Sequence, residues 1–104
     1  MNKLELLEPY RASIDAIDNK IIDLLVERTG VIREVGQLKY SKKIPAVIAE
    51  RIEQVRERSA ERAQGKGLDP DLVRQIYTVL IDYSCDLEDK IIERLIEEEK
   101  NCAA

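Results

Sequence analysis

The chain lacks histidine, phenylalanine and tryptophan altogether, and its only aromatic residues are 4 tyrosines among 104 residues. Without histidine, the side chain that most often serves as a general base or metal ligand is absent. No metal-ligand spacing and no glycine-rich phosphate loop takes its place. Apolar residues still make up 44% of the chain, so we expect one domain spanning residues 1–104 with a core of Ile, Leu and Val.

Other features are also scarce. No apolar run approaches membrane-spanning length, and the first residues lack the apolar segment of a signal peptide. Cys85 and Cys102 have no redox or metal spacing. The net charge is −4 with both signs interspersed, whereas a nucleic-acid or anionic-membrane surface calls for clustered cations. We therefore expect a cytoplasmic protein that has neither nucleic acid nor membrane as a partner.

Helical periodicity begins near Pro9, which we expect in the first helical turn, and continues to about Ser41. A helix of this length is roughly 50 Å long, whereas a compact domain of this size has a radius of gyration of about 13 Å. The rest of the chain cannot cover such a helix, although its apolar stripe runs along nearly all of it. An intertwined homodimer is the expected arrangement, and a kink at Gly30 or Gly36 is the alternative.

Two further helices are predicted, and no strand pattern competes with them. The first runs from about Ala46 to Gln64 and stops at a glycine-rich turn, Gly65-Lys66-Gly67. Asp69 then caps a helix that begins at Pro70 and continues to about Glu99. The predicted fold is an all-α chain of three helices, of which the first is long.

Two cations stand in the middle of the first helix's apolar stripe. At about 100° per residue, Lys39 lies within roughly 20° of Arg28 on the helix surface, and Ile17 and Ile21 share the sector. A cation in an apolar core is costly unless it is paired, so the two predict a buried anion site. The alternatives are that both reach solvent or pair with core carboxylates. Arg11 lies some 100° away, so we expect it to reach such a site only from a partner chain.

The third helix places Ser84 and Glu88 one turn apart on its apolar face. Such a serine is usually a small core residue bonded to its own backbone, but buried carboxylates are rare unless they are paired. An ion pair of Glu88 with Arg28 or Lys39 is the structural alternative. A site of Arg, Lys, Ser and Glu in aliphatic surroundings suits positioning and electrostatic stabilisation, without a cofactor or a covalent nucleophile.

Three segments of the first helix together resemble one enzyme family. They are 10–18 (YRASIDAID), 24–28 (LLVER) and 34–39 (EVGQLK). This sequence is similar to the first helix of the all-helical chorismate mutases, and the spacing of Arg11, Arg28 and Lys39 fits that pattern. Residues 44–45, 50–51 and 81–88 extend the resemblance to about residues 5–95.

The resemblance implies an intertwined dimer that binds a small dicarboxylate and rearranges chorismate to prephenate without a cofactor. It assigns one substrate carboxylate to Arg28 and the other to Arg11 of the partner chain. Lys39 would donate to the ether oxygen, with position 88 as the second contact. Arg51, with Ile48 beside it on the second helix, and Ser84 would complete the pocket.

One departure from the family concerns position 88, where other members often carry Gln. Glu88 can donate a hydrogen bond to the ether oxygen only when it is protonated. This reasoning predicts that activity falls at alkaline pH and that Glu88→Gln removes the dependence.

A second departure concerns the second helix, which in the family usually carries a carboxylate at the position of Ile52 and often a polar residue at that of Ile48. Both face the C4 hydroxyl of chorismate, and a buried polar group without a partner costs about 1–3 kcal/mol. Residues 51–55 (RIEQV) and 85–89 (CDLED) look like the 4-amino-4-deoxychorismate mutases, which make the amino analogue of prephenate. Chorismate mutase is the close alternative. An isochorismate–pyruvate lyase and a non-catalytic helical dimerisation module are the others.

Overall fold

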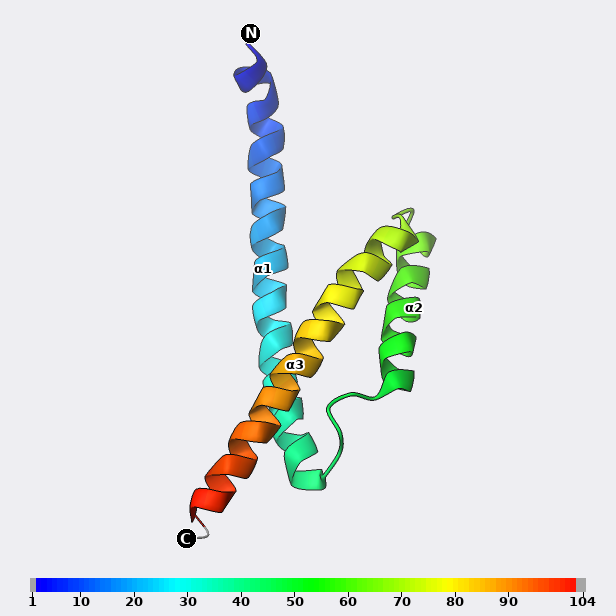
Figure 1. The fold of residues 1–104 in the computed structure, drawn as a ribbon. Coiled ribbons are helices and arrows are strands. Elements are labelled where there is room, and N and C mark those ends of the chain that lie inside the picture. Colours follow the sequence, from blue (N-terminus) through cyan, green and yellow to red (C-terminus); the bar gives the residue numbers. More distant parts are fainter. Residues whose placement is uncertain (1, 103–104) are drawn as a thin grey trace. The chain divides into compact units, whose positions relative to one another are not determined.

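A computed structural model of the protein describes residues 2–102 (Figure 1). Its elements are α1 (Lys3–Lys42), α2 (Ala49–Gly65) and α3 (Pro70–Cys102). Residues 2–102 contain no strand, which confirms an all-α chain of three helices with a long first helix. None of the helices in this range is both long and apolar enough to cross a membrane.

The start predicted for α1 was wrong by six residues, because α1 begins at Lys3 and Pro9 lies inside it. Asn2 provides the cap that the prediction missed, since its Oδ1 accepts a hydrogen bond from the backbone N–H of Glu5 at 2.9 Å. Proline inside a helix removes one backbone donor, and the helix nevertheless continues past it to Lys42.

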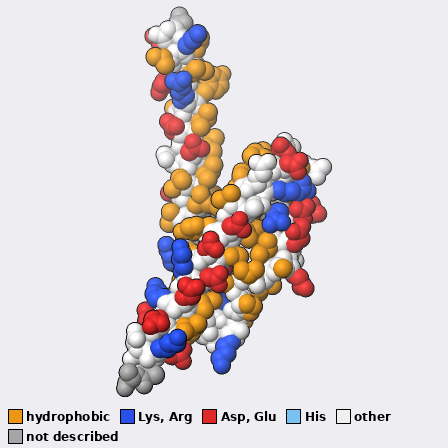
Figure 2. Space-filling view, viewed as in Figure 1, with side chains coloured by type: hydrophobic (Ala, Val, Ile, Leu, Met, Phe, Trp, Pro, Cys, Tyr) orange, Lys and Arg blue, Asp and Glu red, His pale blue; other side chains and the backbone are white. Residues whose placement is uncertain are grey.

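The chain divides into two units, one up to Val31 and one from Ile32 onward, and each is described by itself. The first unit consists of the amino-terminal 29 residues of α1 (3–31). Its hydrophobic side chains form a stripe that remains exposed and is visible along α1 in Figure 2. Ile21 has the smallest exposed fraction of this set, at 48%; the set is Tyr10, Ile14, Ile17, Ile21 and Leu24.

In the second unit, α2 and α3 lie side by side as an antiparallel hairpin (Figure 1). The turn between them is built as the sequence predicted. Gly67 has a positive φ of 79°, and the N–H of Leu68 bonds back to the carbonyl of Ala63 at 2.9 Å. This is a Schellman stop, in which glycine meets the left-handed conformation without strain. Asp69 then caps α3, because its Oδ1 accepts from the N–H of Asp71 at 2.9 Å.

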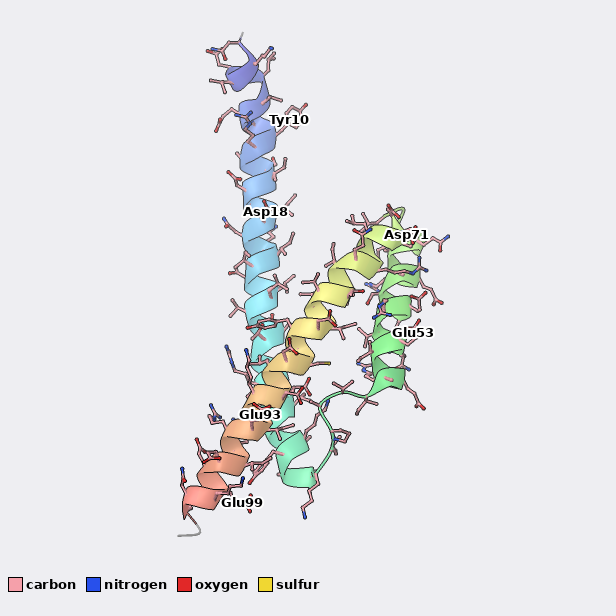
Figure 3. All side chains as sticks on the ribbon, in the orientation of Figure 1. Tyr10, Asp18, Glu53, Asp71, Glu93 and Glu99 are labelled. Atoms are coloured by element: carbon pink, nitrogen blue, oxygen red, sulfur yellow. The ribbon has the colours of Figure 1, made fainter. Side chains whose placement is uncertain are left out.

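Small and branched apolar side chains pack between α2 and α3. Ala60 and Ala63 are buried on α2, and Val73 and Ile81 are buried on α3. Charged pairs line the exposed side of the hairpin. Arg74 lies 3.1 Å from Glu57 and 2.6 Å from Asp71, and Figure 3 labels Asp71 at the start of α3 and Glu53 on α2.

The last turns of α1 also pack against α3 within the second unit. Gly36 is buried, and a Cβ added there would lie 3.2 Å from Cδ1 of Ile91. The close approach of the two helices explains the glycine at this position. Nearer the carboxyl end of α1, the Tyr40 hydroxyl donates a hydrogen bond to Glu99 of α3.

The predicted start of α2 at Ala46 was also wrong, because the helix begins at Ala49. Ile48 is extended, with φ −122° and ψ 100°, and its side chain makes no capping hydrogen bond. Ala46 instead belongs to the connector, where its side chain is buried and its carbonyl accepts a hydrogen bond from Lys39. The carbonyl of Ala46 therefore accepts from a side chain rather than from the backbone N–H of a helix.

Candidate active site

Lys39 is the cation at the centre of the candidate site. It lies in the last turns of α1, where its side chain keeps only 15% of its surface exposed. Its Nζ donates a hydrogen bond to the carbonyl oxygen of Ala46 at 2.9 Å and lies 2.6 Å from Oε1 of Glu88. One ammonium therefore joins α1, the connector and α3.

Glu88 is one of the most deeply buried charged residues of the second unit, with 4% of its surface exposed. The ion pair with Lys39 confirms the structural alternative for this carboxylate. Although the two atoms are only 2.6 Å apart, Oε1 has no aligned hydrogen-bond partner within residues 2–102. We interpret the contact as a close ion pair, because the distance is short and both side chains are largely buried.

Ser84 lies one turn before Glu88 on the same face of α3 and is buried. Its hydroxyl donates to the carbonyl of Leu80 at 2.8 Å, as expected for a serine bonded to its own helix. Cys85 follows it. Burial raises the pKa of the Cys85 thiol, as does the nearby Glu88, whereas Lys39 lowers it. A thiol with a raised pKa stays protonated near neutral pH and is a poor nucleophile.

The beginning of α2 holds the other three predicted pocket residues. Ile48 is the residue before the first helical turn, and Ile52 is half-buried one turn later. Arg51 is exposed, and its Nη1 donates to Oε1 of Gln54 at 2.8 Å. Its guanidinium is thus held by a neutral amide and keeps further donors for an anion.

Arg11 and Arg28 belong to the first unit. Arg11 is exposed, whereas Arg28 is half-buried and has an interaction partner. Lys39, Arg51, Ser84, Glu88 and both isoleucines belong to the second unit. The structure thus joins Lys39 directly to Glu88.

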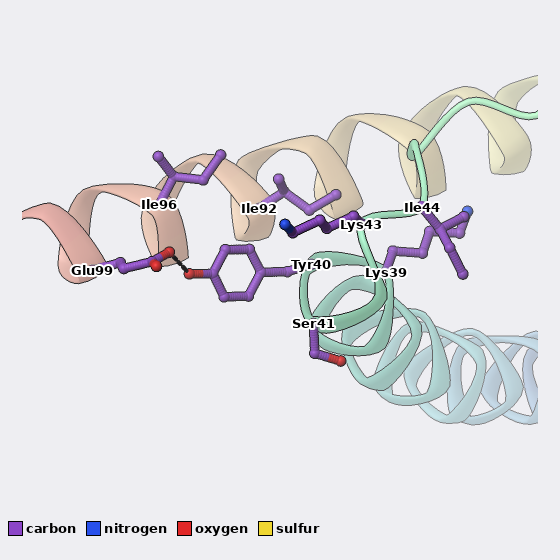
Figure 4. Close-up of a pocket in the computed structure, with 8 residues that line it drawn as sticks. All are labelled: Lys39, Tyr40, Ser41, Lys43, Ile44, Ile92, Ile96 and Glu99. Carbon is purple, nitrogen blue, oxygen red and sulfur yellow. Dashed lines mark hydrogen bonds between the residues drawn. The ribbon is translucent and has the colours of Figure 1, made fainter.

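The sequence analysis did not predict two features around Lys39. The first is the Ala46 carbonyl, since backbone groups do not appear in a residue pattern. The second is a pocket of about 430 Å³, shown in Figure 4, whose lining includes Lys39 and no other predicted site residue. The hydrogen bond from Tyr40 to Glu99 lies along it, and Ile44, Ile92 and Ile96 supply apolar walls. Within residues 2–102, no three Cys, Asp or Glu side chains gather closely enough to hold a metal ion.

Comparison with known proteins identifies the family of the chain. The profile of the family "Chorismate mutase type II" matches residues 10–89, which includes Arg11, Lys39 and Glu88. The chain belongs to this family. It is accordingly an isomerase of the chorismate mutase type, which confirms the resemblance in the sequence.

Individual relatives carry two names. The chain is 33% identical over 86 residues to a 4-amino-4-deoxychorismate mutase of Streptomyces pristinaespiralis, covering 83% of this chain and 67% of that protein. It is 28% identical over 88 residues to the enzyme of the same name in Streptomyces venezuelae, covering 85% of each. It is also 29% identical over 90 residues to a chorismate mutase of Methanocaldococcus jannaschii, covering 86% of this chain and 91% of that one.

Proposed function

We propose that this chorismate mutase family member rearranges 4-amino-4-deoxychorismate to 4-amino-4-deoxyprephenate. The names of the two Streptomyces relatives support this substrate. The aliphatic pair Ile48 and Ile52 leaves the C4 hydroxyl of chorismate without a polar partner. A C4 amine beside the same two side chains is no better served, so the names of the relatives carry the choice of substrate. Chorismate is the second candidate, favoured by the relative in Methanocaldococcus jannaschii.

The observation that carries the reaction class is the largely buried Lys39 ammonium. In a Claisen rearrangement the ether C–O bond breaks as a new C–C bond forms within the same molecule, so no group or electron leaves the substrate. Negative charge grows on the ether oxygen as the C–O bond lengthens. A preorganised donor aimed at that oxygen in a site of low dielectric constant stabilises the transition state more than the ground state. Lys39 takes this role in the proposal, with Glu88 beside it and Ser84 on the wall.

The two substrate carboxylates require two further cations. We assign one carboxylate to Arg28 and the other to Arg11 of a second copy of the chain, with Arg51 at the rim of the pocket. Arginine binds carboxylates through paired donors, which would hold the flexible enolpyruvyl arm over the ring. The site then needs no cofactor.

A homodimer is part of this proposal, and two exposed stripes support it. One is the stripe on the first unit, from Tyr10 to Leu24. The other lies on the side of α3 away from its buried face, where residues 72, 76, 79 and 83 fall within roughly 60° of one another. These four are Leu72, Ile76, Val79 and Tyr83, with 43% to 68% of each side chain exposed. In a two-fold dimer, the stripe on the first unit of one copy would cover the stripe on α3 of the other copy.

Each chain of the intertwined pair would be a single helical domain spanning residues 1–104. The two unpaired cysteines of each chain, Cys85 and Cys102, suit a cytoplasmic protein, because cytosolic thiols stay reduced.

The decisive experiment offers the pure protein 4-amino-4-deoxychorismate, chorismate and isochorismate separately and identifies each product. We expect the highest kcat/KM for the amino substrate, with 4-amino-4-deoxyprephenate as the product. Prephenate from chorismate at higher kcat/KM would establish the second candidate instead. Pyruvate released from isochorismate would mark a lyase, and no turnover of any substrate would mark a non-catalytic helical module.

Mixed dimers test whether Arg11 acts across the interface. Arg11→Ala and Lys39→Ala chains are each expected to be inactive alone. After mixing and re-equilibration, half of the dimers are hybrids with one intact site, so roughly a quarter of the normal activity should return. No recovery in a mixture shown to contain hybrids would place Arg11 and Lys39 of one site on the same chain.

A further inference from the structure

We propose that the pocket between the end of α1 and the end of α3 binds a small zwitterion, namely an amino acid with an apolar side chain. Its lining combines a cation, Lys43, and a carboxylate, Glu99, with aliphatic walls. The inference goes beyond the proposed function and does not rest on it, because a ligand here would be neither the substrate nor the product of the rearrangement.

The pocket is separate from the candidate active site. Lys39 contributes to its lining, but the ammonium of Lys39 points away from Tyr40 and Glu99 and donates to the carbonyl of Ala46 at 2.9 Å (Figure 4). Glu88, which forms the ion pair with that ammonium, is not a lining residue. The pocket has a volume of about 430 Å³, and small-molecule pockets usually have volumes of roughly 300–1,000 Å³.

The first support is the backbone conformation of Lys43. A Schellman stop ends α1, because the N–H of Ile44 bonds to the carbonyl of Lys39 at 2.8 Å and the N–H of Lys43 to that of Tyr40 at 3.3 Å. Lys43 occupies the left-handed position of this stop, with a φ of 57°. Glycine is the usual residue there, since a side chain is strained in this conformation, and the chain itself uses Gly67 at the equivalent position after α2. A lysine kept at such a position indicates a function for its side chain.

The second support is the ammonium of Lys43, which has no partner of its own. Within residues 2–102 its side chain makes no hydrogen bond and no ion pair, although it lines the pocket. A cation near a helix carboxyl terminus also interacts favourably with the helix dipole, which is the structural alternative. The neighbouring Lys42 already lies in the last turn of α1 and does not line the pocket. The dipole alone therefore does not explain a strained second lysine.

The third support is the carboxylate of Glu99. The Tyr40 hydroxyl donates a hydrogen bond to it and holds it beside the pocket (Figure 4). An ionised carboxylate accepts about four hydrogen bonds, so Glu99 keeps acceptors for a ligand ammonium. Within the described part of the chain, Glu99 forms no ion pair with Lys43 or with another cation. Two unneutralised charges of opposite sign in one pocket match a ligand that carries both.

The walls define the rest of the ligand. Ile44 and Ile96 keep 39% and 40% of their surfaces exposed, and Ile92 is half-buried. An aliphatic side chain laid against them would remove apolar surface from water on both partners. The Ser41 hydroxyl already donates to the carbonyl of Leu38 at 3.0 Å and adds no polar requirement. We therefore expect the ligand carboxylate at Lys43, its ammonium at Glu99 and its apolar side chain on the isoleucines.

The first experiment is an NMR titration of the full chain, labelled at its isoleucine methyl groups. L-leucine is the probe, with 4-methylpentanoate and 3-methylbutylamine as analogues that each lack one of its two charges. We expect L-leucine to shift the methyl signals of Ile44, Ile92 and Ile96 saturably in the millimolar range, and each analogue to bind about fivefold more weakly. Equal affinities of the three compounds would overturn the zwitterion class. The absence of a saturable shift, or shifts confined to Ile48 and Ile52, would overturn the site.

The second experiment compares charge-removing variants with matched controls. Lys43→Gln and Glu99→Gln should each weaken L-leucine binding about fivefold, because each removes a charge-assisted contact. Lys42→Gln and Glu98→Gln remove the same charges one residue away, outside the pocket lining, and should change the affinity less than about twofold. An affinity that falls equally in a variant and its control would assign the effect to net charge and contradict the proposal.

Lys43→Gly separates a ligand contact from a purely structural lysine. Glycine meets the left-handed conformation without strain, so this variant should have a higher midpoint of chemical denaturation than wild type. It should nevertheless bind L-leucine as weakly as Lys43→Gln does. Undiminished binding by the Lys43→Gly protein would show that Lys43 only ends α1, and the inference would fail whichever substrate the enzyme uses.

Discussion

The two units of the chain treat their hydrophobic residues in opposite ways. The second unit buries Val73, Ile81 and Ile91 within itself and encloses a charged pair among its helices. The first unit exposes about half or more of Ile14, Ile17 and Ile21 along a single helix. One unit thus supplies its own core, whereas the other carries an apolar surface of the kind that a partner covers.

The candidate site follows the same division. The second unit supplies the preorganised part, since Lys39 is fixed by two contacts. In the proposed function, the first unit would supply Arg11 and Arg28 from a helix whose apolar face is exposed. On that proposal, transition-state stabilisation depends on the fold of each chain, whereas the binding of one substrate carboxylate, by Arg11 of a second copy, depends on assembly. Substitutions in the second unit should therefore lower kcat, whereas substitutions in the first unit should change the oligomeric state.

The largest effect is expected in the second unit, from Lys39→Met. Activity should fall at least about a hundredfold, the scale of losing one preorganised donor. The single variant also leaves the Glu88 carboxylate buried without its cation, which costs about 3–5 kcal/mol of unfolding free energy. Assays of the wild type and the Lys39→Met variant measure the loss of activity, and chemical denaturation of the same two proteins measures the loss of unfolding free energy.

The double variant Lys39→Met with Glu88→Leu removes the stranded charge and is the matched control. Its unfolding free energy should recover most of the loss while activity stays absent. If activity returned together with stability, Lys39 would be structural, and another residue would have to stabilise the charge on the ether oxygen.

An intermediate effect is expected in the first unit, from Ile17→Asp. A carboxylate in the middle of the exposed stripe should oppose its burial against a second copy, so that the mass measured by analytical ultracentrifugation falls toward that of one chain. Activity should then depend on protein concentration, as expected for a site shared between copies.

Asn19→Asp introduces the same charge on the opposite side of α1, roughly 160° from Ile17 around the helix, and should leave the mass unchanged. A full-mass, fully active Ile17→Asp protein would show that this stripe covers no second copy, and the contrast between the two units would lose its functional meaning.

Side-chain chemistry made the second unit the more predictable of the two. Gly67 and Asp69 act as the helix stop and cap that their residue types indicate, because each satisfies backbone groups locally. Lys39 and Glu88 could be placed on buried faces by helical spacing alone, since charges are rare in such positions. The pairing of these two could be named only as an alternative, because spacing along separate helices does not fix their distance.

The boundaries were harder to predict because competing signals existed. Pro9 resembled a helix start, but Asn2 already supplied a cap earlier in the chain. Ala46 has a high helix propensity, yet its carbonyl bonds to Lys39 rather than to a helical N–H. In both places a single hydrogen bond decided the boundary, and the bond from Lys39 to the backbone carbonyl of Ala46 has no residue signature.

The smallest expected effect compares the two glycines inside α1. Replacing Gly30 by Ala meets no atom within 4 Å in residues 2–102, so the higher helix propensity of alanine should stabilise the protein by about 1 kcal/mol. At Gly36 the new Cβ would meet Ile91 at 3.2 Å, and crowding should cancel or reverse that gain. Denaturation of the two variants gives the difference between their unfolding free energies. Combining Gly36→Ala with Ile91→Val should recover part of the lost stability, because the smaller side chain makes room for the new Cβ. Equal stabilisation at both glycines would mean that α1 and α3 do not approach closely at Gly36. The packing that supports Lys39 would then have to be explained without that contact.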